Sequence, residues 1–424
     1  MTKTDPAFEQ ALAVGRPPNI KKLFPNSRAL IVSGKAVDRG MIKKGHAMTI
    51  AANSRNSFVL RGALMAAQRA NAAIILEIAR SESNYCDVSM WNIARQADQA
   101  ANELGITVPV AIHADHYGIK KPGDVAEAKV EIPTLFEAGI TSIAIDASHL
   151  PDADNLIANL ELAPFVPSWA GYETEVGEIK GKDGLSTPEE ALFLIKGLNA
   201  NGLHPDWIAL NNGTTHGIEA SGNGIQVELT ARIHEALAPY GISGAQHGTS
   251  GNSSEKLREI AARTATTKAN VATALQMISW GVAVNDYGNA IMDAAGNFIK
   301  EPDKGISPEL WEQMVAYADG KALKAGDYKK LNCAFEHKLL AQPTAVRERM
   351  SGAVAEFVSW LLTDVFNAAD TAPLCIDALT TAGSYDLGPK ADRIENPADW
   401  TREKIAARAA GMHCDKGPEG DFDD

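Results

Sequence analysis

Short apolar runs alternate with longer helical stretches over most of the 424-residue chain. The runs are rich in β-branched and other apolar residues, which is typical of buried strands, and each precedes an Ala- and Leu-rich stretch. Glycines at positions 105, 139 and 241 stand where such helices would end. The eight predicted strands begin at Ala47, Ala72, Val108, Thr141, Gly171, Asp206, Gly244 and Thr266.

This alternation predicts an α/β fold. Right-handed crossovers join parallel strands into βα units, and eight such units close into a (β/α)₈ TIM barrel. The fifth and seventh predicted strands are polar, with the sequences GYETEVGE and GAQHGTSG. Polar residues at the C-terminal ends of barrel strands are expected where this fold builds its active site.

The strand pattern divides the chain into three predicted regions. Residues 1–45 form a polar, Pro-containing lead with one or two short helices that cover the barrel bottom. Residues 46–290 form the catalytic barrel, and residues 291–424 form a C-terminal helical extension with an acidic tail. The long apolar helices of this extension favour self-association, so we expect a homodimer or homotetramer.

Composition narrows the class of protein. The chain is 45% hydrophobic and 22% charged, which is sufficient for a large core. Its net charge of −13 argues against nucleic acid or an anionic membrane as a partner. The four cysteines are scattered, as expected for free thiols in a reducing compartment, and the first residues form no apolar signal segment. We therefore predict a cytoplasmic location.

Three histidines stand at predicted strand ends, in the segments HADH, NNGTTHG and QHGTSG. They are His116, His216 and His247. A single such histidine is more often a hydrogen-bonded structural residue. Three of them with an open fourth position are typical of a catalytic zinc site, although imidazole also suits other divalent transition metals.

Carboxylates accompany these histidines. Asp115 precedes His116, and because neighbouring side chains of an extended strand face opposite sides, a turn is needed for both to reach the site. Asp115 could then exchange a proton with a substrate hydroxyl, or it could merely cap the next helix. Glu173 and Glu175 share one strand face, so either a cation, a lysine or a histidine N–H lies beside them or both glutamates are solvated, and the sequence leaves both readings open.

Glycines and hydroxyls follow the last two predicted strands, in HGTSG from His247 and NVAT from Asn270. Glycine lets backbone N–H groups approach an anion closely, and the loops after strands seven and eight are the usual phosphate site of a TIM barrel. This position predicts a phosphate-binding site.

The ordered set HADH, IDASHLP, YETEVG, NNGTTHG, QHGTSG and KANVAT resembles the class II fructose-bisphosphate and tagatose-bisphosphate aldolases, from about Ala47 to Met277. The resemblance implies a TIM barrel that holds Zn²⁺ or a similar divalent metal. It also implies reversible cleavage of a small phosphorylated ketose to dihydroxyacetone phosphate and an aldehyde, and it allows a monovalent cation near the phosphate.

The resemblance assigns roles to residues that match the motifs. His116, His216, His247 and Glu175 match the metal shell, and Asp115 matches the group that protonates the aldehyde oxygen. The positions that match contacts to the ketose or its phosphate are Asn53, Gly217, Gly248, Ser250, Gly251, Asn270 and Thr273.

The chain also departs from the family pattern. GKDG replaces the usual loop glutamate with Lys182 or Asp183, so Asp183 becomes the candidate for moving the proton on carbon. Arg347 or Arg349 could supply the arginine that the family brings from a C-terminal helix to a distal phosphate, and we assign Arg349.

Two other functions stay open from the sequence. A metal-dependent epimerase, or another enediolate enzyme on the same barrel, would form isomers without cleaving a carbon–carbon bond. A non-catalytic aldolase-like subunit would bind no divalent metal.

Overall fold

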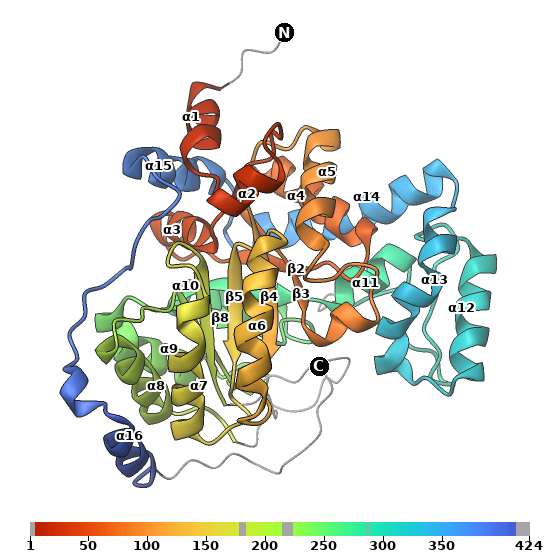
Figure 1. Cartoon of the computed structure of the whole chain (residues 1–424). Helices are drawn as coiled ribbons and strands as arrows, with labels where there is room; N and C mark the ends of the chain where they lie inside the picture. Colours follow the sequence, from red (N-terminus) through yellow and green to blue (C-terminus); the bar gives the residue numbers. More distant parts are fainter. Residues whose placement is uncertain (1–4, 178–183, 214–223, 286–287, 413–424) are drawn as a thin grey trace.

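Eight parallel strands form a closed barrel in the computed structural model, which describes residues 5–177, 184–213, 224–285 and 288–412 (Figure 1). Each strand pairs with its neighbours in chain order, and the last pairs with the first. The predicted TIM barrel is confirmed, and every strand overlaps its predicted run. The strands are β2 (Thr49–Asn53), β3 (Ile74–Ala79), β4 (Val110–Gly118), β5 (Ser142–Asp146), β6 (Gly171–Val176), β7 (Trp207–Leu210), β8 (Ser243–Gln246) and β9 (Thr266–Val271).

Helices surround the barrel and begin at residues suited to helix N-termini. Asn56 accepts hydrogen bonds from two backbone N–H groups of α4, and Thr187 forms a reciprocal capping box with Glu190 at α8. Such caps satisfy N–H groups that have no partner within the helix. The helices that follow β2 to β8 are α4 (Ser57–Ala70), α5 (Ile93–Leu104), α6 (Asp124–Glu137), α7 (Asp152–Leu162), α8 (Pro188–Ala200), α9 (Val227–Leu237) and α10 (Ser254–Arg263).

A helix from the predicted extension completes this ring. β9 leads into the short helix α11 (Thr273–Trp280), and the chain then leaves the barrel. It returns as α14 (Thr344–Trp360), which packs against α4, while the π-helical turn η5 (Leu361–Val365) contacts α10 and β2. Residues 281–343 are therefore an excursion between the last strand and a helix of the ring.

The excursion forms a lobe with its own apolar core, seen at the right of Figure 1. It contains α12 (Pro308–Gly320), the 3₁₀ turn η4 (Ala325–Lys330) and α13 (Leu331–Leu340). Trp280, Trp311 and Phe335 are buried in this core. The lobe places η4 beside the barrel mouth, where its lysines line a cavity.

Three helices precede the barrel, where one or two were predicted: α1 (Pro6–Val14), α2 (Pro18–Leu23) and α3 (Gly34–Lys44). A short strand, β1 (Ile31–Val32), pairs with the start of β4, and α3 contacts β3, β4, β6 and β9 at the barrel bottom. Glycine permits this approach, since a Cβ on Gly34 would lie 2.6 Å from the Cβ of Ser142.

Residues 366–412 run along the outside of the barrel. α15 (Ala372–Ala382) packs against α1 and α3, and an extended stretch leads to α16 (Arg402–Ala409), which packs against α7 (Figure 1). Within the described residues, no helix combines the length and apolar character needed to cross a membrane.

Candidate active site

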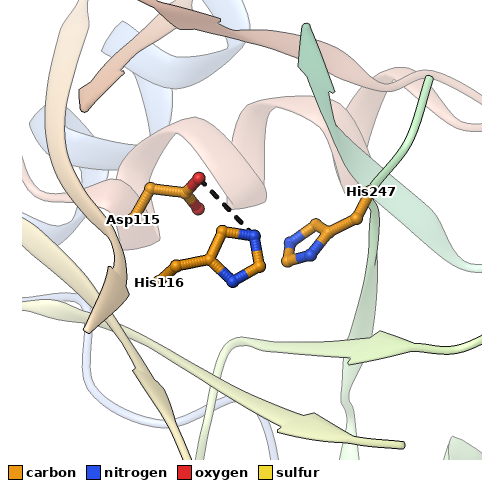
Figure 2. A group of neighbouring side chains, drawn as sticks. All are labelled: Asp115, His116 and His247. Atoms are coloured by element: carbon orange, nitrogen blue, oxygen red, sulfur yellow. Dashed lines mark ion pairs between the residues drawn. The ribbon is translucent and has the colours of Figure 1, made fainter. Parts of the chain in front are cut away.

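A bulge in β4 brings two neighbouring side chains to the same side. Ala114 pairs with Ile143 and Tyr117 with Ile145, so β4 has one residue more than β5 over this interval. His116 occupies the extra turn with a φ of +42°, a conformation that costs a non-glycine residue about 1–2 kcal/mol. The turn that the sequence predicted between Asp115 and His116 is therefore present. Figure 2 shows both side chains on the same side as His247.

The hydrogen bond between Glu173 and His247 fixes which ring nitrogen of the histidine is free. Nε2 of His247 lies 3.1 Å from Oε1 of Glu173. Burial raises the pKa of Glu173, but nearby Lys268 and His247 outweigh it and lower the pKa to about 2, so the carboxylate accepts and Nε2–H donates. Nδ1 of His247 then carries its lone pair, is buried and has no hydrogen-bond partner among the described residues.

Glu175 stands between the two histidines. Its Oε1 lies 3.3 Å from Nδ1 of His116, and its Oε2 lies 3.7 Å from Nδ1 of His247. Oε1 is buried without a hydrogen-bond partner in the described part of the chain. Burial and the charge of Asp146 raise the pKa of Glu175 well above its ordinary value. A cation would resolve this unfavourable burial.

These donors fit a divalent metal. The ring centroids of His116 and His247 lie 4.5 Å apart, and Asp115, His116 and His247 each offer one ligand atom within 4.8 Å of the others (Figure 2). Imidazole nitrogens with a carboxylate oxygen are the ligands that Zn²⁺ and related metals take. Glu173 is hydrogen-bonded to His247, and Asp146 is hydrogen-bonded to His116. Carboxylates that bond to the second ring nitrogen of a metal-bound histidine orient its ring in the same way.

Lys268 balances the negative charge below this centre. Its ammonium is fully buried and donates to Glu173 (2.8 Å), Nε2 of His113 (3.1 Å) and Asp115 (3.4 Å). Burial lowers the pKa of Lys268, but Glu173, Glu77 and Asp115 outweigh it and hold the pKa above its ordinary value. Since the lysine donates to Nε2 of His113, that histidine is neutral, and burial together with Lys268 lowers its pKa to about 3.

Asp115 is held ionised at the mouth of the barrel. Nδ2 of Asn270 donates to its Oδ1 over 3.0 Å, in addition to Lys268. Burial raises the pKa of Asp115, but His116 and Lys268 outweigh it and keep the pKa well below its ordinary value. A buried carboxylate of this kind can accept a proton from a bound hydroxyl group.

A cavity of about 660 Å³ opens above these residues, a size typical of small-molecule sites. Arg55 and η4 lie on its walls. The sequence-predicted site residues that line it are Asn53, Asp115, His116, His247, Gly248, Ser250, Asn270 and Thr273.

A model of the class-II fructose-bisphosphate aldolases matches residues 40–325. The chain belongs to this family. Members are metal-dependent lyases, and the fit of the histidine–carboxylate centre agrees with that chemistry.

Curated relatives are fructose-bisphosphate aldolases of modest identity. The protein of Treponema pallidum is 26% identical over 44% of this chain and 55% of its own length. That of Streptococcus pneumoniae is 27% identical over 66% of this chain and 89% of its own length. The YdjI aldolase of Escherichia coli K12 shares the fold, with a TM-score of 0.55 and 18% identity over 81% of this chain and 99% of that one.

Two predicted residues lie elsewhere in this aldolase-family barrel. Nε of Arg349 donates to the carbonyl oxygen of Gly305 over 2.6 Å, so this side chain is turned toward the excursion and does not line the cavity. Gly251 adopts a φ of +95°, a Cβ on it would lie 3.5 Å from the side chain of Asn289, and it is not among the residues that line the cavity. His216, Gly217 and Asp183 lie outside the described residues.

Several residues of this aldolase-family site were given no role from the sequence: Arg55, Glu77, His113, Asp146 and Lys268. Glu77 and Asp146 stand in strands that are otherwise mostly apolar, so a charge in such a strand was the available signal for them. The strands at or before the other three residues contain further polar residues, which leaves no such signal.

Proposed function

We propose that the protein is a metal-dependent aldolase that reversibly cleaves a phosphorylated ketose, fructose 1,6-bisphosphate or a related sugar phosphate, to dihydroxyacetone phosphate and an aldehyde. The observation that carries the proposal is the convergence of His116, His247 and Glu175 beside the ionised Asp115. We infer that these three residues hold Zn²⁺ or another divalent transition metal, together with His216.

The metal would supply the polarisation of the substrate carbonyl that stabilises an enediolate. Asp115 accepts the proton of the substrate hydroxyl as the carbon–carbon bond breaks, and returns it to the aldehyde oxygen in the reverse direction. Asn270 and Lys268 orient Asp115 through their hydrogen bonds to Oδ1.

Basic and hydroxyl groups at the cavity wall support an anionic substrate. Arg55 is 7% exposed, its Nε donates to Glu82 (2.6 Å), and its Nη1 donates to Thr273 (3.3 Å). Within the described residues, Nη2 makes no hydrogen bond, although the side chain lines the cavity. With Ser250 and Thr273 on the same wall, Arg55 offers donors to a phosphate. A monovalent cation near this phosphate stays a prediction.

The test is a panel of ketose monophosphates and bisphosphates incubated with metal-replete protein, with release of triose phosphate measured by a coupled reductase. We expect EDTA to abolish cleavage, borohydride to trap no imine, and Asp115→Asn to lose cleavage by 100-fold or more. Asp303→Asn, on an exposed loop away from the cavity, is the control. Isomer formation without cleavage, or no bound metal, would overturn the proposal.

Oligomeric state and location are also proposals. α14, which helped to suggest a homodimer or homotetramer, packs against α4 of its own chain, so this face of the helix is not available for self-association. Sedimentation equilibrium would measure it directly. A cytoplasmic location agrees with the acidic composition and the small phosphorylated substrate.

A further inference from the structure

Glu77 is a buried carboxyl group at the end of β3 that faces the catalytic cavity. It pairs in register with Asn53 on β2 and with His113 on β4, and its side chain is 0% exposed. It lines the same cavity as Asp115 and His116. The barrel therefore presents a second carboxyl group to the place where a substrate would bind.

Glu77 has no hydrogen-bond donor among the described residues. Neither oxygen of Glu77 accepts a hydrogen bond from the described residues, and the nearest cation is Nζ of Lys268 at 3.5 Å. That ammonium already donates to Glu173, His113 and Asp115. Leaving a buried polar group unpaired costs about 1–3 kcal/mol, so packing alone gives no reason for a glutamate here.

A second metal does not explain Glu77 either. Glu77, His113 and Asp115 offer ligand atoms within 4.8 Å of one another. However, Lys268 places its positive charge among all three, at 3.5, 3.1 and 3.4 Å. His113 uses Nε2 to accept from that lysine and Nδ1 to donate to Ser142. Both ring nitrogens are thus engaged.

Glu77 and Asp115 are neighbouring carboxyl groups with unequal contacts. Asp115 accepts hydrogen bonds from Asn270 and Lys268, which favour its ionised form, whereas neither oxygen of Glu77 accepts one from the described residues. Burial also raises the pKa of Glu77 well above its ordinary value. Two neighbouring carboxyl groups whose surroundings favour opposite protonation states are suited to act as an acid and a base in one site.

We propose that Glu77 is the group that delivers a proton to, and removes it from, the substrate carbon, while Asp115 handles the hydroxyl proton. This proposal rests on the aldolase function proposed above. It gives Glu77 on β3 the proton transfer at carbon for which the sequence had offered Asp183 in the GKDG loop.

In cleavage, Asp115 takes the hydroxyl proton, the carbon–carbon bond breaks, and its electron pair stays on the ketone fragment as an enediolate. The neutral Glu77 carboxyl then gives its proton to the enediolate carbon, which yields dihydroxyacetone phosphate and leaves a Glu77 carboxylate. Solvent water takes the proton from Asp115 and another returns to Glu77, so both groups regain their starting states. In condensation and in exchange, Glu77 first loses its proton to solvent, and its carboxylate then removes the proton from the substrate carbon to form the enediolate. In condensation, Asp115 carries a proton from solvent and gives it to the aldehyde oxygen.

The test separates the two proton transfers. Metal-replete protein is incubated with dihydroxyacetone phosphate in D₂O, and exchange of the carbon-bound hydrogen is followed by NMR, alongside ketose cleavage. Glu77→Gln keeps the size of the side chain and should slow both exchange and cleavage by 100-fold or more, with KM and bound metal unchanged. Asp115→Asn should slow cleavage and retain exchange. Glu77→Asp should restore part of the exchange.

The outcomes distinguish this inference from the proposed function. If wild-type protein exchanges and cleaves while Glu77→Gln exchanges within threefold of it, the role of Glu77 is refuted and the aldolase function stands. Loss of exchange in Asp183→Asn but not in Glu77→Gln would assign the proton to the loop. If wild-type protein neither exchanges nor cleaves, both proposals fail.

Discussion

Lys268 is expected to hold the interior of the barrel together by neutralising its carboxylates. Lys268→Met keeps the side-chain volume and removes the ammonium that lies 2.8 and 3.4 Å from the carboxylates of Glu173 and Asp115. Removing one partner of a buried ion pair costs about 3–5 kcal/mol, because an uncompensated charge stays buried. Asp115 retains Asn270 and Glu173 retains His247, so we expect a loss of about 4 kcal/mol rather than a sum over two pairs.

The assay is urea unfolding of metal-free protein at pH 7, followed by tryptophan fluorescence. Glu173→Gln combined with Lys268→Met should recover about 2 kcal/mol of the loss, because the largest uncompensated charge is then also removed. Lys129→Met is the control, since Lys129 pairs with Glu161 at a partly exposed position and its loss should cost under about 1 kcal/mol. A loss below about 1 kcal/mol in Lys268→Met, or no recovery in the double variant, would refute the reasoning.

Three further changes test other parts of the structure. Glu173→Gln should weaken metal binding about 10–100-fold in a chelator competition, because Glu173 orients His247, and unaltered affinity would contradict this. Arg55→Gln should raise KM for the phosphorylated ketose about tenfold or more while bound metal is unchanged; an equal KM would place the phosphate elsewhere. Burial lowers the pKa of His234 to about 4, so the unfolded chain takes up the proton first as the pH falls below about 6.5, and stability is lost down to about pH 4. His234→Gln should therefore reduce the loss of unfolding free energy between pH 7 and pH 5 by about 2 kcal/mol, and an unchanged loss would contradict the buried neutral histidine.

The sequence predicted the barrel because the strand–helix rhythm is local information. Strands such as IILEIA and TSIAID are recognisable from their apolar runs alone, and crossover handedness then fixes the order of the strands. The same local information led to the candidate residues Asp115, His116 and His247, which lie at or directly after the C-terminal ends of strands and which the structure brings together. The bulge was also predictable, because regular strand geometry cannot bring Asp115 and His116 to one side.

The partners of buried charges could not be predicted in this way. A lysine in TTKANV and a glutamate in IILEIA signal that each needs a partner, but which carboxylates meet Lys268 depends on the register and closure of the barrel. Arg349 shows the same limit. Its helix α14 is separated from β9 by the excursion 281–343. The direction in which the Arg349 side chain points therefore depends on how α14 packs against α4, which the sequence does not reveal.

The two ends of the barrel show why unsatisfied polar atoms, rather than polar residues as such, mark the site. At the bottom, Asp38 accepts from Thr267 and from Lys390, and Lys390 also donates to Ser243 and to the carbonyl oxygen of Asp206. The ammonium of Lys390 thus has three acceptors and both oxygens of Asp38 accept a hydrogen bond, as in a group whose role is to hold the fold, although Nη1 of the neighbouring Arg39 has no hydrogen-bond partner among the described residues. At the top, buried acceptor atoms of residues around the cavity have no hydrogen-bond partner among the described residues: Oδ1 of Asn53, both oxygens of Glu77, Oε1 of Glu175, Nδ1 of His247 and Oδ1 of Asn270. Such a concentration is costly unless a ligand completes it, so this end of the barrel is the one built to bind a metal and a polar substrate.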